Sequence, residues 1–109
     1  MNELLSSMKK YVDDDEKILA FVVGIFEKDN FMLCYQHGIF VATTRRLLFY
    51  VKFPYYPSTF KEYSYLHIDS IDFHSYFEFT YNHETIRAKH IQKGNVEQFI
   101  HAVRANMNN

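Results

Sequence analysis

Residues 38–53 constrain the fold of this chain more than any other stretch. Two runs of apolar, β-branched and aromatic residues lie on either side of a four-residue polar break at residues 43–46. Residues of these types favour strands, and a short polar break between two such runs is typical of a hairpin turn. The stretch therefore predicts a β-hairpin, and the rest of the chain must cover its apolar faces.

The chain has the size and composition of one ordered domain. Its 109 residues suffice for a single hydrophobic core and are too few for two. Hydrophobic residues make up 48% of the chain and charged residues 23%, which is the profile of a globular protein. The net charge of -1 provides no strong positive field, so no nucleic-acid partner is expected.

The cysteine content and the apolar segments predict a cytoplasmic protein. Cys34 is the single cysteine and has no partner for an intrachain disulfide, which fits a reducing compartment. The longest apolar stretch, residues 18–26, is far shorter than a membrane span, and no secretion signal opens the sequence. Membrane contact is therefore expected to be peripheral at most.

Hydrophobic alternation predicts about seven short strands. They are expected at residues 18–26, 31–43, 47–53, 60–64, 68–74, 76–81 and 85–91. Gly38 is expected to form a bulge or a bend within its strand. A turn is expected at residues 65–67, and a last hairpin around residues 82–84.

The two ends of the chain have helical patterns. After Asn95 the apolar period changes from two to 3.6, and the apolar stripe consists of Val96, Phe99, Ile100, Val103 and Met107. Asn95 and Gln98 resemble a capping box at the start of this C-terminal helix. A shorter helix is predicted at residues 2–11, followed by an acidic run at residues 13–16. We interpret this run as a solvated linker, with metal binding as the less favoured alternative.

The order and spacing of these motifs resemble the bacterial pleckstrin-homology-like domains of the YokE-like type. A strand that ends in Thr-x-x-Arg runs on into Leu-hydrophobic-Phe, and a Tyr-x-x-Ile-x-x-hydrophobic element and a final helix follow. The matching positions are Thr43, Arg46, Leu47, Phe49, Tyr65, Ile68 and Ile71. The resemblance extends over roughly residues 16–107.

This resemblance implies the fold and the general kind of function. The expected fold is α+β and mainly β: a PH-like, partly open barrel of about seven antiparallel strands in two sheets, capped by the C-terminal helix. The PH-like domain would span residues 16–109, and residues 1–15 would form the N-terminal helix and the acidic linker. The resemblance also implies a non-enzymatic binding or assembly module of undefined ligand, and no cofactor is expected.

Four motif residues are expected to have structural roles: Thr43, Arg46, Tyr65 and Ile68. Arg46 lies beside Arg45 at the hairpin turn, where a cation could meet a phosphate. Its motif position instead favours pairing with a carboxylate or with carbonyl groups. Thr43 suits a hydroxyl that stabilises the turn, because no general base is evident beside it.

Phosphate and metal sites are less favoured than ordinary surface roles. Residues 27–30 place one lysine between two acids, which is a poor phosphate cradle. A weaker basic surface could form from Arg87, Lys89 and Lys93, although a solvated face is favoured. His74 ends the predicted strand at residues 68–74 and His90 lies on the last hairpin, so the two could come close and bind a metal, but no further ligand motif accompanies them.

Catalysis is not expected from this sequence. His67, Asp69 and Ser70 are the residue types of a hydrolytic triad. Neighbours on one strand cannot adopt the geometry of a triad unaided. We therefore expect a protein that is not an enzyme.

Self-association is the favoured form of binding. Both faces of residues 18–26 are apolar, and the N-terminal helix is expected to cover part of that surplus at best. Phe21 and Val23 are therefore predicted to contact a second copy in a homo-oligomer, and their replacement by Glu should dissolve the assembly.

The alternative function is peripheral membrane or lipid binding. Tyr55 and Tyr56 lie between two prolines and would form a stiff aromatic loop, with the cations Lys52 and Lys61 nearby. The same loop could contact a protein or a peptide, or it could pack on the domain itself.

Overall fold

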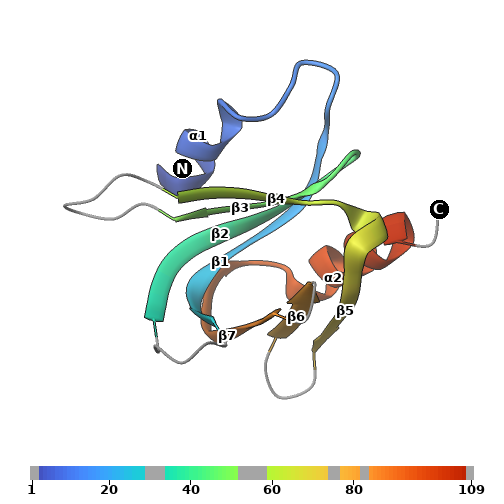
Figure 1. Cartoon of the computed structure of the whole chain (residues 1–109). Coiled ribbons are helices and arrows are strands. Elements are labelled where there is room, and N and C mark those ends of the chain that lie inside the picture. Colours follow the sequence, from blue (N-terminus) through green and yellow to red (C-terminus); the bar gives the residue numbers. More distant parts are fainter. Residues whose placement is uncertain (1–2, 29–33, 52–58, 74–76, 82–83, 108–109) are drawn as a thin grey trace.

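The structure, a computed structural model, describes residues 3–28, 34–51, 59–73, 77–81 and 84–107. Its elements follow one another as a short helix, seven strands with one 3₁₀ turn among them, and a longer helix (Figure 1). In chain order they are α1 (Glu3–Lys9), β1 (Ile18–Lys28), β2 (Cys34–Thr43), β3 (Leu47–Val51), β4 (Thr59–Tyr63), η1 (Tyr65–His67), β5 (Ile68–Phe73), β6 (Phe77–Tyr81), β7 (Glu84–Gly94) and α2 (Val96–Met107).

The strands form an open antiparallel barrel. Their order in the sheet is β4-β3-β2-β1-β7-β6-β5, so β4 and β5 are the two edges of this sheet. Figure 1 shows the sheet curling around an interior, with α2 on the inner side and α1 on the opposite side. The predicted fold class is confirmed: it is mainly antiparallel β with a short N-terminal and a longer C-terminal helix.

The expectation of two sheets is wrong, because β1 joins both halves into one sheet. This strand is 11 residues long and pairs with β2 on one side and with β7 on the other. The β1–β7 register shifts between Val23 and Gly24 and again between Ile25 and Phe26. Such irregularities increase the local bend and twist of a sheet, so one sheet can curl around the core.

The predicted hairpin at residues 38–53 is confirmed where the structure describes it. β2 and β3 pair without a register shift, from Ala42 opposite Leu47 to Gly38 opposite Val51. Gly38 is therefore not a bulge, and the expected bend at this position stays a prediction. A Cβ atom at this position would lie 2.8 Å from the Tyr50 carbonyl oxygen, so glycine serves close packing here.

Several element boundaries differ from the expected ones. Glu27 and Lys28 belong to β1 rather than to a polar turn, and β7 continues to Gly94. The expected turn after Lys28 and the start of the next strand, residues 29–33, lie outside the described residues, as do the end of the third predicted strand and the last hairpin turn.

A bulge in β1 changes which side chains share a face. The β1–β2 register shifts between Ile18 and Ala20, at Leu19. Leu19 is 39% exposed as a result, while Ile18 packs with Phe21 and Val23 on the same side of the sheet. The strict alternation expected for residues 18–26 is therefore interrupted at Leu19.

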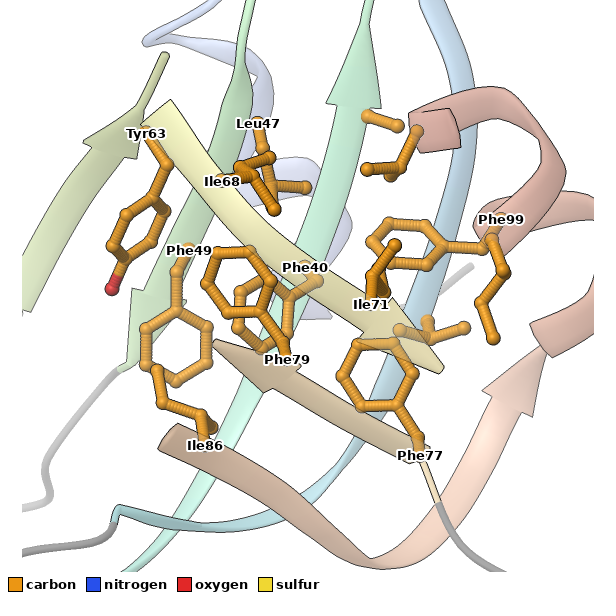
Figure 2. Packing of buried hydrophobic residues seen from close by; sticks show 14 of the residues in the cluster. Phe40, Leu47, Phe49, Tyr63, Ile68, Ile71, Phe77, Phe79, Ile86 and Phe99 are labelled. Atoms are coloured by element: carbon orange, nitrogen blue, oxygen red, sulfur yellow. The ribbon is translucent and has the colours of Figure 1, made fainter. Parts of the chain in front are cut away.

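Aromatic rings fill the interior of the barrel. Phe40 of β2 lies at the centre, with its ring centroid 4.4 Å from that of Phe49 and 5.0 Å from that of Phe26. Phe79 of β6 and Phe99 of α2 approach the same ring at 5.5 and 6.2 Å (Figure 2). These contacts join strands from both halves of the sheet to the C-terminal helix.

The predicted stripe of the C-terminal helix is confirmed. Phe99, Ile100 and Val103 are buried in the interior, and Val96 and Met107 pack beside them. The Gln98 backbone N–H donates to the Asn95 side-chain oxygen at 2.9 Å, which satisfies a free donor of the first helical turn.

Candidate functional site

The side of the sheet that faces away from the aromatic interior carries a second cluster of buried apolar side chains, which we call the outer face. Its central strand residues are at most 3% exposed: Val23, Ile39, Val41, Leu48 and Tyr50. They belong to β1, β2 and β3, and α1 lies over them with Leu4 and Met8. Leu4 and Met8 are four residues apart, so they project from the same side of α1. The outer face therefore accommodates a short amphipathic helix.

Partly buried residues surround this centre and extend the cover beyond α1. They are Leu5, Tyr11, Val12, Ile18, Phe21 and Phe60. The Tyr11 ring stacks on Phe60 of β4 with 4.3 Å between ring centroids. The Tyr11 N–H donates to the Met8 carbonyl at 3.0 Å, so the chain turns tightly after α1 and keeps Tyr11 on the sheet. Residues 3–12 thus act as one covering segment.

This cover corrects the expectation that the N-terminal helix would hide only part of the apolar surplus. Val23 is fully buried and Phe21 is partly buried in the cluster that α1 covers in its own chain. Two local features explain the difference. The bulge places Leu19 outside the outer face, and the Tyr11 ring extends the cover to Phe60 of β4.

A polar cluster, which we call the Glu16 clamp, holds the start of β1 against the β2–β3 turn. It consists of Glu16, Thr43, Arg46 and Tyr65. The Thr43 hydroxyl donates to Glu16 Oε2 at 2.5 Å, and Arg46 donates to both carboxylate oxygens at 3.0 Å. The Tyr65 hydroxyl donates to the Thr43 carbonyl oxygen at 2.6 Å. The clamp therefore joins β1, the turn and η1.

Arg46 also binds groups outside the carboxylate of Glu16. Its Nη2 donates to the Tyr11 carbonyl at 2.9 Å, and its Nη1 contacts Glu62 of β4. All three guanidinium nitrogens thus contact acceptors within the chain. The Arg46 guanidinium therefore links the covering segment to two strands. Its charge is balanced by acceptors of its own chain.

The acidic run does not behave as one solvated linker. The side chain of Glu16 is fully buried. Its negative charge is balanced there by Arg46. The Arg46 guanidinium holds the pKa of Glu16 at about 2, well below its usual value of 4.5. Asp13 and Asp15 are exposed and pair with Arg45. The solvated-linker interpretation is therefore wrong for Glu16.

Burial also affects the tyrosine of the clamp. It raises the pKa of the Tyr65 hydroxyl, which therefore stays protonated and remains a hydrogen-bond donor. Ile68 follows η1 and is buried in the interior. The four expected motif residues thus lie in or beside the junction of η1 with the β2–β3 turn.

Shallow hollows lie at two other places on the described surface. One of about 340 Å³ lies where α2 packs beside the end of β5, and it is lined by Phe73, Glu97, Ile100, His101 and Arg104. Arg104 donates to the Ile71 carbonyl at 2.8 Å and so covers part of the β5 edge. Hollows of about 320 and 340 Å³ adjoin Arg45 and Ser64, beside Leu66, which is 75% exposed.

Of the remaining expected interaction residues, the structure describes only Lys61. Lys61 is exposed on β4, whereas Lys52, Tyr55 and Tyr56 lie outside the described residues. The aromatic loop expected to contact a membrane or a protein therefore has no described geometry. In the parts of the chain that the structure describes, no helix is both long and apolar enough to span a membrane.

The structure describes only some of the residues considered for metal or phosphate binding. His90 is exposed on β7, and His74 lies outside the described residues. Arg87 donates to Glu78 of β6 at 3.1 Å, and Lys93 is exposed further along β7. Among the described residues, no group of three or more His, Cys, Asp or Glu side chains could hold a metal ion.

The sequence did not reveal the acid that pairs with Arg46 or the complete cover of the outer face. Glu16 is the last acid before an apolar strand, and this position is the one local sign that it differs from its aspartate neighbours. Nothing local identifies its partner, because Arg46 is 30 residues away. The contact between Tyr11 and Phe60 likewise depends on where β4 lies in the sheet.

The arrangement of strands and helices agrees with a match to a protein family. No curated protein sequence matches the chain. Residues 12–105 match the family described as Bacterial PH domain, and this range contains β1 to β7 and most of α2 but begins after α1. The predicted resemblance is confirmed at this level, and the YokE-like subtype stays a prediction. Such a match supports a non-catalytic module. Because it extends over most of the sequence, the chain belongs to the bacterial PH domain family.

Proposed function

We propose that this chain is a non-catalytic binding and assembly module of the bacterial PH type, and that it self-associates through the outer face. One observation carries the proposal: a buried apolar face on β1, β2 and β3 lies outside the barrel interior and is covered by α1. The cytoplasmic location expected from the single cysteine belongs to the same proposal.

The helix that covers this face is short. α1 has seven residues, and isolated helices of that length are marginal in water. Leu4 and Met8 are its buried side chains. Burial of each stabilises the docked helix by about 2 kcal/mol. Ordering the segment offsets part of this gain, so a minor population with an open outer face is expected. An exposed face of that kind associates with another apolar surface.

The substitutions expected to dissolve an assembly are unsuitable as a test. Val23 is fully buried, so Glu at this position would place an unpaired charge in the cluster and would unfold a monomer as well. A test of self-association must therefore leave the outer face intact.

The experiment is the absolute mass of the intact chain by light scattering on a sizing column, over a wide concentration range. We expect a species of at least twice the 13.1 kDa chain mass whose fraction rises with concentration. A constant mass of 13.1 kDa at every concentration would contradict self-association.

A control variant separates the outer face from the most exposed large apolar side chain of the described residues. Leu66 is 75% exposed on η1 and belongs to neither apolar cluster. Leu66→Ser should leave the mass distribution unchanged. Loss of the larger species in this variant would assign the contact to the η1 corner instead of the outer face.

A further inference from the structure

We propose that two copies associate by reciprocal exchange of the covering segment, so that residues 3–12 of each copy lie on the outer face of the other. This inference rests on the proposed function, because it requires self-association. It names the occupant of the outer face in the assembly as α1 of a second copy. The kind of occupant follows from the structure, in which that helix is already seated on this face.

The contacts of the covering segment can be transferred as a unit. Five of its residues belong to the outer cluster and none to the interior cluster: Leu4, Leu5, Met8, Tyr11 and Val12. An exchanged segment would make the same apolar contacts, the same Tyr11–Phe60 stacking and the same hydrogen bond from Arg46 to the Tyr11 carbonyl. Exchange of an identical element therefore changes little except the hinge.

The hinge lies between the covering segment and the Glu16 clamp. Glu16 is fixed to Thr43 and Arg46, so it stays with its own barrel. Residues 13–15 connect the two parts, and the Glu16 N–H donates to the Asp13 carbonyl at 3.0 Å in a turn. Exchange requires this turn to open.

One hydrogen bond, from the Asp13 N–H to Glu16 Oε1 at 3.1 Å, ties the turn to the clamp and must break on opening. The other interactions that hold the turn are weak. Arg45 pairs with Asp13 and Asp15, and in both pairs the side chains are about half exposed or more. Exposed ion pairs of this kind contribute little to stability. Once open, three residues span roughly 10 Å. The two clamps must therefore lie close to the two-fold axis, which defines the geometry of the assembly.

Cross-linking tests which copy supplies the segment. The parent carries Cys34→Ser, which removes the single native cysteine, and the test variant adds Tyr11→Cys and Phe60→Cys. These two rings are stacked on each other at 4.3 Å between centroids, so thiols at the two positions lie within reach of one cross-linker, and light scattering on the same variant shows whether it still associates. A short bismaleimide joins the two thiols, and a denaturing gel separates joined from unjoined chains.

Exchange predicts covalent dimers in proportion to the dimer fraction measured by light scattering. Closed monomers from a sample that light scattering shows to be dimeric would overturn exchange and leave self-association standing. A monomeric mass at every concentration would overturn both proposals. The outcomes are therefore distinguishable.

Mixed samples supply the matched control. Chains with Tyr11→Cys alone and chains with Phe60→Cys alone are unfolded, mixed and refolded before cross-linking. Exchange predicts a covalent dimer that joins one Tyr11→Cys chain to one Phe60→Cys chain. Absence of this product from a dimeric sample counts against exchange. Chains with His90→Cys replace the Phe60→Cys chains as the negative control, because His90 is exposed on β7, with three strands between it and β4 in the sheet. Covalent dimers in that control would show that the reagent joins chains that merely collide. The dimers in the test sample would then no longer support exchange.

Discussion

At the scale of single residues, Glu16 shows how a buried acid can stabilise this fold. Its carboxylate binds Thr43 and Arg46, which are 27 and 30 residues further along the chain. Burial of a carboxylate is unfavourable in isolation, but here the hydrogen bonds and the guanidinium charge outweigh that cost. The result is a strongly lowered pKa rather than a raised one.

We predict an acid-dependent loss of stability from Glu16. Its pKa is about 2 in the folded chain and 4.5 in the reference state. The stabilisation is therefore complete above pH 4.5 and is lost as the pH falls towards 2, when the unfolded chain takes up the proton first. The shift corresponds to about 3 kcal/mol in the free energy of unfolding. Urea unfolding over this pH range measures it.

Two variants show whether Glu16 is the source of this acid loss. Glu16→Gln should lower stability at neutral pH by about 3 kcal/mol and should flatten the acid dependence. Asp14→Asn changes an exposed acid in the same run and should retain the dependence of the native chain. An unchanged acid slope in Glu16→Gln would show that other carboxylates cause it.

At the scale of elements, the junction of β7 and α2 is specified by two neighbouring residues. Gly94 has a φ of 101°, and a Cβ atom there would lie 2.2 Å from the Phe21 carbonyl oxygen, so this position requires glycine. Asn95 then caps α2 through Gln98. Strand, junction and cap together aim the apolar stripe of α2 into the barrel.

We predict that Asn95→Ala lowers the free energy of unfolding by about 1 kcal/mol, because it removes the acceptor for a donor of the first helical turn. Chemical denaturation checks the value. Asn95→Asp keeps an acceptor oxygen and should stay close to the native stability. Equal losses in the two variants would mean that the cap contributes nothing beyond side-chain volume.

At the scale of the whole molecule, the chain builds two apolar clusters on the two sides of one sheet. The interior is closed by α2, most of which lies inside the matched family range. The outer face is closed by α1, which precedes that range. The Glu16 clamp lies between the outer cover and the barrel, and Arg46 of the clamp binds the cover at the Tyr11 carbonyl. The exchange proposed above requires the outer cover to move while the barrel stays folded.

We predict that the length of residues 13–15 controls the mass of the assembly. Deletion of Asp14 shortens the hinge and should favour exchange, because the segment can no longer turn back without strain. Insertion of Gly-Ser-Gly-Ser after Asp14 should favour the monomer. Light scattering after refolding at matched concentrations measures both. A dimer fraction that does not depend on hinge length would contradict exchange.

The local patterns of the sequence predicted the elements whose signals are complete within a short window. Alternation predicted the β2–β3 hairpin, and the 3.6-residue stripe with Asn95 predicted α2 and its cap. These features depend on backbone periodicity and on hydrogen bonds between near neighbours. They could therefore be inferred residue by residue, together with the open barrel that the motif order implied.

The sequence by itself thus determined the strands, the C-terminal helix and the family, because those depend on order and spacing along the chain. The tertiary structure alone decided that one sheet forms, that Leu19 leaves the outer face, that Glu16 pairs with Arg46 and that α1 covers β1 to β3 in its own chain. Each of these depends on contacts between segments that are distant in sequence, and local periodicity carries no information about which distant segments meet.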